Sequence, residues 1–338
     1  MNERVLVIGA GGISNAWFPP IVAEQLDVVA VVDLSRAAAQ KQVEKYALPN
    51  AVIHEGLDAA LREVRADFAL DLTIPDAHFA VTTQCLEAGL HVVGEKPMAA
   101  TLDQARAMIA TSERTGRMFM TSQSRRWDDR HATIAATVRS GRLGRITGIH
   151  CDFFIGAHFG GFREQMESVL ILDMAIHHFD LARMFLGSDA SDVWCEEHNP
   201  PGSWYRHGAA ADAIFTMGDG VRFNYRGSWA AEGAHTSWNG DWRIVGTEGT
   251  LLYAGDADPQ GSIVDPHGKP GFHRPLLPLE VEKVELEAKG MHGALREMLR
   301  FLRTGETPQT ECHDNVRSLA MVHAAMTSSR QGRRVAVG

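Results

Sequence analysis

The sequence predicts an α/β chain: an N-terminal Rossmann domain with a doubly wound parallel sheet, then a C-terminal α+β domain with an open, mostly antiparallel sheet. Three observations support this. Short β-branched runs alternate with helix-like segments in the first third of the chain, and the first run ends at a glycine cluster. After about residue 122, strand-like runs follow one another with glycine-rich turns between them. We therefore expect domains at 1–122 and 123–338.

The first domain is predicted from its short, continuously apolar strands. Such strands are typical of a parallel sheet with helices on both faces. Pro19 and Pro20 lie within the first helical segment, where we expect a kink or a turn. We expect strands at 4–8, 27–32, 68–72, 91–93 and 118–122, and helices at 13–25, 36–46, 78–88 and 102–115.

The second domain is predicted to combine helices with consecutive strands. An antiparallel sheet commonly leaves one face without helices, and we expect Phe223, Tyr225 and Trp229 on that face. We expect helices at 130–139, 171–185, 291–302 and 314–331, strands at 146–155, 211–217, 221–229, 236–245 and 250–253, and a long loop at 256–278.

The overall charge argues against large anionic partners. The 338 residues include 33 Lys and Arg against 42 Asp and Glu, a net charge of −9. Such a chain repels phosphate backbones and anionic lipid, so we predict no nucleic-acid or membrane partner. No apolar run reaches the roughly 18–20 residues of a membrane helix. The four cysteines lie far apart without a Cys-x-x-Cys pair, which indicates free thiols in a reducing compartment and a cytoplasmic protein.

The glycine cluster after the first strand has the pattern of a phosphate-binding loop. Gly9 permits a tight turn, Gly11 lets the backbone approach a pyrophosphate, and the next helix offers free N–H groups to that anion. Ser14 stands at the third motif position, where glycine is usual. Glycine clusters also serve as plain turns, so the loop alone is weak evidence. The predicted cofactor contacts in this loop are Gly9, Gly11, Gly12, Ile13 and Ser14.

An acidic residue strengthens the prediction of a dinucleotide site. Asp33 ends the second strand, where an acid binds the ribose hydroxyls of the cofactor. Asp33 could instead cap the following helix. An acid at this position repels a 2′-phosphate, which favours NAD over NADP. Arg36 leaves that choice open, because it could reach a phosphate or stack on adenine.

A lysine follows the strand at 91–93. Lys96 lies in the segment Glu95-Lys96-Pro97. The carboxyl ends of strands in an open parallel sheet face the ligand crevice, so Lys96 can reach a nicotinamide and a substrate. The residue before a proline is held extended, which would fix the position of Lys96. The alternative is a lysine in a surface loop.

A second polar group lies in the predicted helix at 171–185. Asp173, His177 and Asp180 share one face of that helix. A carboxylate beside an imidazole fixes its tautomer and raises its basicity, which suits acceptance of an alcohol proton. The alternatives are a core histidine, a helix cap or a metal ligand. No third ligand stands at motif spacing, so we predict no metal site.

In this combination the sequence resembles the glucose–fructose oxidoreductase, inositol dehydrogenase and rhizopine-catabolism (Gfo/Idh/MocA) family over nearly its whole length. Each segment is weak evidence alone, but their order and spacing together are specific. Ile74 and Ala175 depart from the family pattern, since proline and glycine are usual there. The matching segments are Gly9–Ser14, Asp33, Thr73–His78, Glu95–Pro97, Ser124–Asp128, Gly141–Gly144, Asp173–Asp180 and Gly246–Thr250.

The resemblance implies an NAD-dependent oxidoreductase that transfers a hydride to or from a secondary alcohol of a sugar, inositol or related polyol. Lys96 matches the family lysine at the reacting hydroxyl, and Asp173 and His177 match the acid and histidine of the catalytic set. Either Lys96 or His177 could accept the proton. The further residues that we expect at the cofactor are Thr73, His78 and Glu95.

The second domain supplies aromatic and polar side chains that suit a sugar, which has apolar C–H faces and many hydroxyls. The predicted substrate contacts are Arg125, His158, Arg163 and Trp242. Further aromatic and histidine side chains, most of which we expect in the core or a subunit interface, are Phe159, Phe162, Trp204, Tyr205, His235 and Trp238.

Other functions and assemblies fit the same pattern. The main alternative is a glycosidase that uses NAD transiently on this scaffold. A non-catalytic NAD-binding protein is disfavoured by the presence of Lys96, Asp173 and His177. Reduction of an unsaturated or imine substrate stays within the oxidoreductase class. We also expect a homodimer or homotetramer formed through the C-terminal sheet.

Overall fold

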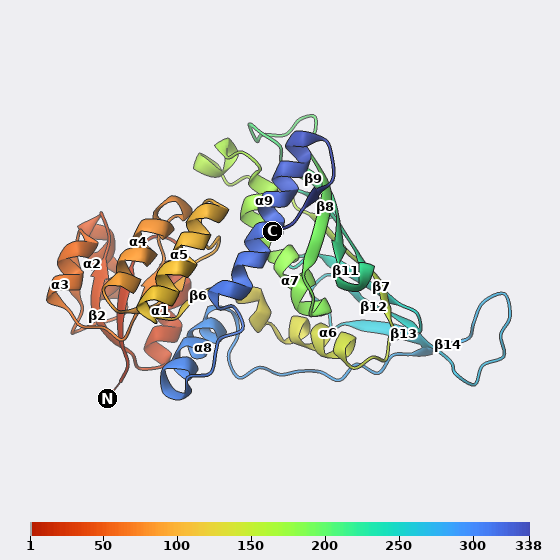
Figure 1. Cartoon of the computed structure of the whole chain (residues 1–338), viewed down its shortest axis with the longest axis horizontal. Coiled ribbons are helices and arrows are strands. Elements are labelled where there is room, and N and C mark those ends of the chain that lie inside the picture. Colours follow the sequence, from red (N-terminus) through yellow and green to blue (C-terminus); the bar gives the residue numbers. More distant parts are fainter. Residues whose placement is uncertain (1) are drawn as a thin grey trace. The chain divides into compact units, whose positions relative to one another are not determined.

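The computed structural model describes residues 2–338, which form two compact units (Figure 1). The first unit extends to Trp127 and also includes Glu287–Val316. The second unit consists of Asp128–Leu286 and Arg317–Gly338. The segment 287–316 therefore belongs with the first unit, whereas the sequence analysis placed it in the second domain.

The first unit contains a six-stranded parallel sheet in the order β3-β2-β1-β4-β5-β6. This order is that of a Rossmann fold, with the chain reversing direction across the sheet beside β1. The predicted doubly wound sheet is confirmed, and β3 is an addition that its three-residue length hid from the sequence analysis. The strands are β1 (Arg4–Ile8), β2 (Asp27–Val32), β3 (Val52–His54), β4 (Phe68–Asp71), β5 (His91–Gly94) and β6 (Phe119–Thr121).

Helices separate these strands in the sequence. Ser35 and Thr101 cap two of them, since each hydroxyl accepts a hydrogen bond from a backbone N–H in the first turn. Pro19 and Pro20 both lie inside the first helix. The helices of this unit are α1 (Ser14–Ala23), α2 (Arg36–Lys45), α3 (Leu57–Glu63), α4 (Pro75–Glu87), α5 (Leu102–Thr115), the 3₁₀ turn η1 (Ser124–Trp127) and α8 (Gly290–Thr304).

Close packing explains why α8 belongs to the first unit. A Cβ atom at Gly293 would lie 2.4 Å from the Cβ of Trp127, so only glycine lets α8 approach η1 this closely. Further along α8, Phe301 packs edge-on against His91, with ring centroids 5.1 Å apart. Local sequence pattern predicts such a helix but not the surface it covers.

The second unit contains a nine-stranded mixed sheet in the order β14-β13-β12-β11-β7-β10-β9-β8-β15. Among the described strands of this second sheet, β7 and β10 form the one parallel pair, which confirms a mostly antiparallel sheet. The strands are β7 (Ile146–Phe154), β8 (Ala190–His198), β9 (Ala210–Met217), β10 (Arg222–Ser228), β11 (Asp241–Gly246), β12 (Gly249–Tyr253), β13 (Gln260–Val264), β14 (Leu276–Pro278) and β15 (Val335–Ala336).

Three differences from the predicted strands stand out in this sheet. Strand β8 was not predicted, because its mixture of polar and apolar residues hides it. The predicted loop at 256–278 instead contains β13 and β14, which pair with each other. The expected strand at 236–245 is shorter at its start, because β11 begins at Asp241.

Helices cover one face of the second sheet (Figure 1). Phe179 of α7 meets Phe215 of β9 edge-on, with ring centroids 4.7 Å apart. The helices of this unit are α6 (Asp129–Arg139), the 3₁₀ turn η2 (Gly161–Gln165), the π-helical turn η3 (Leu170–Ala175), α7 (Ile176–Leu186), the 3₁₀ turn η4 (Gly218–Gly220) and, from Arg317 onward, α9 (Cys312–Gln331).

The prediction that three aromatic residues lie on an uncovered sheet face is wrong. Phe223, Tyr225 and Trp229 are at most 1% exposed. Because side chains alternate along a strand, the neighbouring Arg222 and Arg226 of β10 point to the other face and are exposed. That face of β10 is therefore polar.

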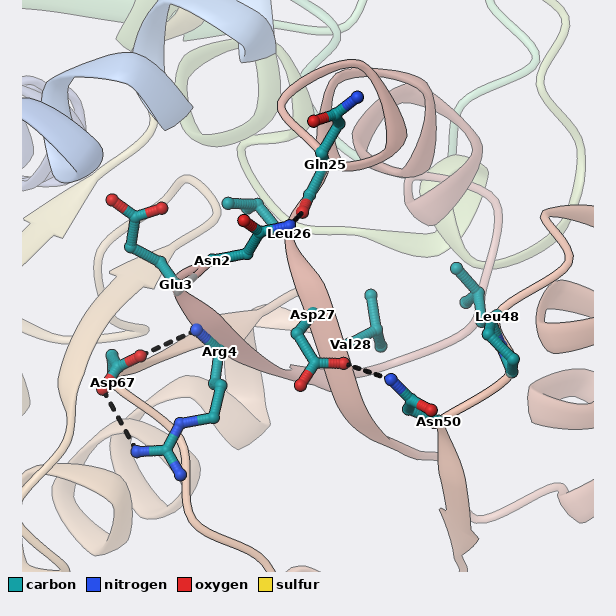
Figure 2. A pocket seen from close by; sticks show the side chains of 11 residues that line it. Asn2, Glu3, Arg4, Gln25, Leu26, Asp27, Val28, Leu48, Asn50 and Asp67 are labelled. Carbon is teal, nitrogen blue, oxygen red and sulfur yellow. Dashed lines mark hydrogen bonds and ion pairs between the residues drawn. The ribbon is translucent and has the colours of Figure 1, made fainter.

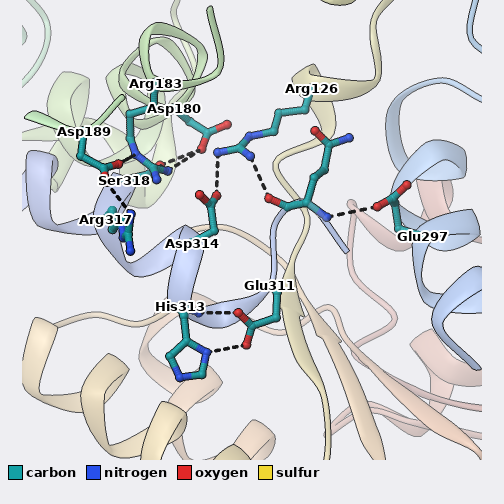
Figure 3. Close-up of polar contacts among 11 residues, drawn as sticks. Arg126, Asp180, Arg183, Asp189, Glu297, Glu311, His313, Asp314, Arg317 and Ser318 are labelled. Atoms are coloured by element: carbon teal, nitrogen blue, oxygen red, sulfur yellow. Dashed lines mark hydrogen bonds and ion pairs between the residues drawn. The ribbon is translucent and has the colours of Figure 1, made fainter. Parts of the chain in front are cut away.

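A buried polar network joins α7 to α9 within the second unit (Figure 3). The Ser318 hydroxyl donates to Asp180 at 2.7 Å, and Arg183 donates to the same hydroxyl at 2.8 Å. Arg183 also donates to Asp189 at 2.8 Å. Asp180 therefore stabilises the packing of two helices. Among the described residues, no helix is both long and apolar enough to cross a membrane.

Candidate functional site

The glycine loop after β1 has the geometry of a phosphate cradle. Gly9 has φ of 100°, and a Cβ atom there would lie 2.6 Å from the carbonyl oxygen of Leu72. At Gly11 and Gly12 an added Cβ would have no atom of the described residues within 4 Å. The loop is therefore fixed against β4 at Gly9 and open above Gly11 and Gly12. Ser14, whose hydroxyl donates to the Gly11 carbonyl at 2.7 Å, begins α1.

Asp33 fastens this loop to the end of β2. Its Oδ2 accepts a hydrogen bond from the Ala10 amide at 2.7 Å, and its Oδ1 accepts from the Ser35 amide at 2.7 Å. A carboxylate has about four lone-pair sites, so two amide bonds leave capacity for ribose hydroxyls. Arg36 is exposed, and its guanidinium donates to the Ile53 carbonyl at 3.4 Å.

A buried carboxylate that the sequence analysis missed lies at the end of β4. Asp71 is fully buried and accepts hydrogen bonds from the hydroxyls of Thr73 at 2.5 Å and Thr82 at 2.9 Å. His78 Nδ1 lies 3.1 Å from Asp71 Oδ2. An acidic residue closing the apolar run of β4 is the one signal that the sequence offered. Thr73 and His78 are thus brought together by Asp71.

Glu95 supports the backbone of Lys96 directly after β5. The indole N–H of Trp17 donates to Glu95 Oε1 at 2.7 Å, and the Lys96 amide donates to Oε2 at 3.2 Å. Burial raises the pKa of Glu95, while the bond from Trp17 and the charges of Lys96 and His78 act in the opposite direction. The Lys96–Pro97 peptide bond is cis.

The first unit fits a dinucleotide by two independent observations. The space above Gly11 and Gly12 is the kind of cradle that a pyrophosphate fills. His78 Nε2 is buried and lacks a hydrogen-bond partner within residues 2–338, which suits a group that meets a bound ligand.

The predicted catalytic residues Asp173 and His177 lie on either side of the point where η3 ends and α7 begins. Asp173 belongs to the π-helical turn that precedes α7, and His177 is the second residue of α7. The expectation of one continuous α-helix is therefore wrong, because a π turn has a wider repeat than an α-helix. Arg163 Nε donates to Asp173 Oδ2 at 3.0 Å, and His177 is 9% exposed.

Arg163 connects Asp173 to an aromatic cluster. Its guanidinium lies over the rings of Phe159 and Phe162, 5.1 and 5.0 Å from their centroids. Phe159 also meets Trp229 edge-on at 5.1 Å, and Trp229 lies 5.4 Å from Trp238.

The cluster presents aromatic surface to solvent at three of its rings. Phe159, Phe162 and Trp238 are 39%, 64% and 50% exposed. Exposed large aromatic side chains gathered in one place commonly mark a binding site.

The remaining predicted substrate contacts fall into different environments. His158 stacks on Trp204 with ring centroids 3.7 Å apart, and its Nε2 lies 2.7 Å from Glu232. Trp242 is 3% exposed and its indole N–H donates to a backbone carbonyl, so we place it in the core. Arg125 lies in the first unit, on η1.

A separate groove lies at the amino ends of the first sheet's strands (Figure 2). Arg4 pairs with Asp67 at 3.4 Å, and Asn50 donates to Asp27 at 2.9 Å. These polar groups bind one another, and ligands of such sheets bind at the carboxyl ends of the strands instead. We assign no function to this groove.

Comparison with known proteins agrees with the geometry in both units. Residues 3–123 match the oxidoreductase family with an NAD-binding Rossmann fold, and residues 131–252 match the Gfo/Idh/MocA C-terminal domain. This chain belongs to the Gfo/Idh/MocA family. The predicted family, fold class, NAD cofactor and enzyme class are thereby confirmed.

Relatives of this Gfo/Idh/MocA oxidoreductase match along nearly its whole length. It is 26% identical to the D-apiose dehydrogenase of Paraburkholderia graminis, covering 97% of this chain and 88% of that protein. It is 24% identical to the 1,5-anhydro-D-fructose reductase of Ensifer adhaerens, covering 96% of each. An oxidoreductase from Agrobacterium radiobacter, solved with NAD+, L-tartaric acid and magnesium, has a TM-score of 0.87 at 19% identity, covering 100% of this chain and 99% of that one. That solved structure therefore shares the fold of this chain.

Two glycine variants should separate cofactor binding from folding. Gly11→Ala has room in the protein, so its stability should match that of the wild type, but its methyl group takes space needed by the pyrophosphate. We expect NADH affinity to fall by at least about tenfold, or 1.4 kcal/mol. Gly9→Ala should instead lower stability, because of its φ and the Leu72 carbonyl. NADH fluorescence titration and urea denaturation measure the two effects. Unchanged NADH affinity in Gly11→Ala would refute the cradle.

Glu95 should make stability depend on pH. Its raised pKa means that the folded protein holds the proton more tightly than the unfolded chain, so the free energy of unfolding falls as pH rises through the folded pKa. Glu95→Gln keeps an acceptor for the Trp17 indole and has no proton to lose, so its free energy of unfolding does not fall in this way. Its stability relative to the wild type should therefore increase from about pH 4 towards pH 8 in urea denaturation. The exposed Glu55→Gln serves as the baseline. A difference that is constant with pH would contradict the prediction.

Proposed function

We propose that this oxidoreductase transfers a hydride between NAD and a secondary alcohol of a sugar, inositol or related polyol. The observation that carries the proposal is the exposed aromatic cluster joined through Arg163 to Asp173. Aromatic faces pack against the C–H faces of a sugar ring, while charged side chains bind its hydroxyls. Relatives named as acting on D-apiose and on 1,5-anhydro-D-fructose support the same substrate class.

We assign proton transfer to side chains of this chain. Bound NAD supplies the hydride acceptor or donor. His177 accepts the hydroxyl proton of the substrate, and Lys96 stabilises the negative charge that develops on the oxygen. The two residues can exchange these roles. Glu95 holds the Lys96 backbone through its amide, so Glu95 acts as a positioning residue.

The spacing in the sequence predicts that Asp173 orients the His177 imidazole, but in this proposal Asp173 holds Arg163. Its carboxylate binds Arg163 at 3.0 Å, so a substrate that contacts the aromatic cluster also contacts a guanidinium held by Asp173. Asp173 thereby links substrate position to the start of α7, where His177 lies. Aligned donor and acceptor carbons are essential for hydride transfer, so such positioning contributes to the rate.

We further propose that NAD is preferred over NADP and that the chain forms a homodimer or homotetramer through its second sheet. Asp33 would repel a 2′-phosphate at the ribose. On the outer face of the sheet, Arg226 donates to Asp152 at 2.8 Å across the parallel strands β10 and β7. Contact between subunits there would therefore bury charged groups rather than aromatic ones.

The function is tested by following NADH absorbance while the protein and NAD meet a panel of inositols, aldoses, sugar lactones and glycosides. We expect a steady rise with at least one polyol or sugar, and a much weaker one with NADP. Glycoside cleavage without net NADH would favour the glycosidase. Lack of reaction across the panel would remove the support for a sugar substrate.

Lys96→Ala is the control for catalysis in this assay. Loss of a group that handles the reacting hydroxyl should lower kcat by about 10²–10⁴-fold. NADH affinity should stay close to that of the wild type. A variant that loses NADH affinity and keeps its kcat would overturn the role assigned to Lys96.

The aromatic cluster can be tested with two matched phenylalanines. Phe162→Ala removes an exposed ring that carries the Arg163 guanidinium, whereas Phe272→Ala removes a ring that is 98% exposed in the segment between β13 and β14. An aromatic contact is worth about 0.5–1.5 kcal/mol, so Phe162→Ala should raise KM for the substrate about two- to twelvefold. Phe272→Ala should leave KM unchanged. Equal KM values for both variants would argue against the cluster as the substrate site.

A further inference from the structure

Three different metal-ligand groups converge in the first unit, where α9 begins. Glu311 precedes the helix, Cys312 is its first residue, and His313 follows. Their carboxylate, sulfur and imidazole atoms all lie within 4.8 Å of one another. Glu311 and His313 appear in Figure 3. No metal site was predicted from the sequence, and three consecutive residues match none of the usual ligand spacings.

The three ligand atoms form a compact triangle. Cys312 Sγ donates to Glu311 Oε1 at 2.8 Å, His313 Nδ1 lies 2.8 Å from the same oxygen, and the sulfur and Nδ1 are 3.6 Å apart. A tetrahedral zinc ion with ordinary bond lengths holds such atoms about 3.3–3.6 Å apart. The sulfur–nitrogen edge already has this length, and a small rotation of the Glu311 carboxylate would open the other two edges.

Glu113 of α5 orients the imidazole for this task. His313 Nε2 lies 2.9 Å from Glu113 Oε1, so a hydrogen on Nε2 is directed to that carboxylate. A histidine that binds a metal usually donates its other ring N–H to a carboxylate in this way, which fixes the tautomer and raises the basicity of the binding nitrogen. In that tautomer, the lone pair of Nδ1 faces Glu311 and Cys312.

We propose that Glu311, Cys312 and His313 bind one zinc ion, with Glu113 as the hydrogen-bond partner of the histidine. Thiolate sulfur, imidazole nitrogen and carboxylate oxygen are all ligands that zinc binds in proteins. His313 is 51% exposed, so solvent supplies the fourth ligand and the ion can be removed by a chelator.

The ion would stabilise the first unit. Glu311 also forms a backbone bridge with Met120 of β6, and Glu113 lies on α5. A zinc ion at this point links the start of α9 to β6 by its ligands and to α5 through the Glu113 hydrogen bond. Ligands that bind the folded state alone raise its stability.

The test uses the full chain, stripped with a chelator and titrated with Zn²⁺ or Co²⁺ in neutral buffer. We expect one equivalent of metal and, with Co²⁺, the near-ultraviolet charge-transfer band of a thiolate ligand. Thermal unfolding should shift upward with Zn²⁺. A stripped chain that binds neither metal would overturn the proposal and leave Glu113, His313 and Glu311 as an ion-paired chain.

Variants locate the metal within the chain. Cys312→Ser should abolish the thiolate band, while Cys195→Ser, at a cysteine equally buried on β8, should keep it. The exposed His313→Gln should also lose the band without unfolding the protein. Glu113→Gln should weaken Zn²⁺ about 10–100-fold, because it leaves all three ligands in place and removes the orienting carboxylate. The site would be refuted if the thiolate band persisted in Cys312→Ser, or if Cys195→Ser removed the band as well.

Discussion

The buried carboxylate of Asp71 is the interaction on which the cofactor side of the molecule depends. A charged group without exposed surface must receive its hydrogen bonds from the protein, and Thr73, His78 and Thr82 provide them. The backbone carbonyl of Asp71 also accepts from the Glu95 amide, which places the lysine segment after β5. Side chains from two strand ends and one helix are therefore positioned by a single residue.

Much of this arrangement was predictable because it follows from the local pattern of apolar and polar residues. Continuous apolar runs ending at Gly9 and Asp33 indicate buried parallel strands whose carboxyl ends form a ligand site. Asp71 itself was not predicted, because its partners His78 and Thr82 reach it only when α4 packs on β4. A single acid at a strand end carries no sign of that packing.

The second unit shows the same limit more clearly. A helix was predicted across Asp173 and His177, but a π turn precedes α7, and the partner of Asp173 is Arg163 from a separate turn. The faces of β10 were also assigned incorrectly, because a shift of one residue exchanges inward and outward side chains. Tertiary contacts decide both the partner of Asp173 and the orientation of β10, and no periodic pattern in the sequence reveals either.

The late segment that completes the first unit has a consequence for synthesis of the protein. Ribosomes add about 5–20 residues per second, so the stretch Asp128–Leu286 separates the Rossmann strands from α8 by about 8–32 seconds. During this time Trp127 lacks the helix that covers it, and Glu24 lacks its partner Arg296 on α8. The nascent chain thus exposes an unfinished surface until the second unit has been made almost completely.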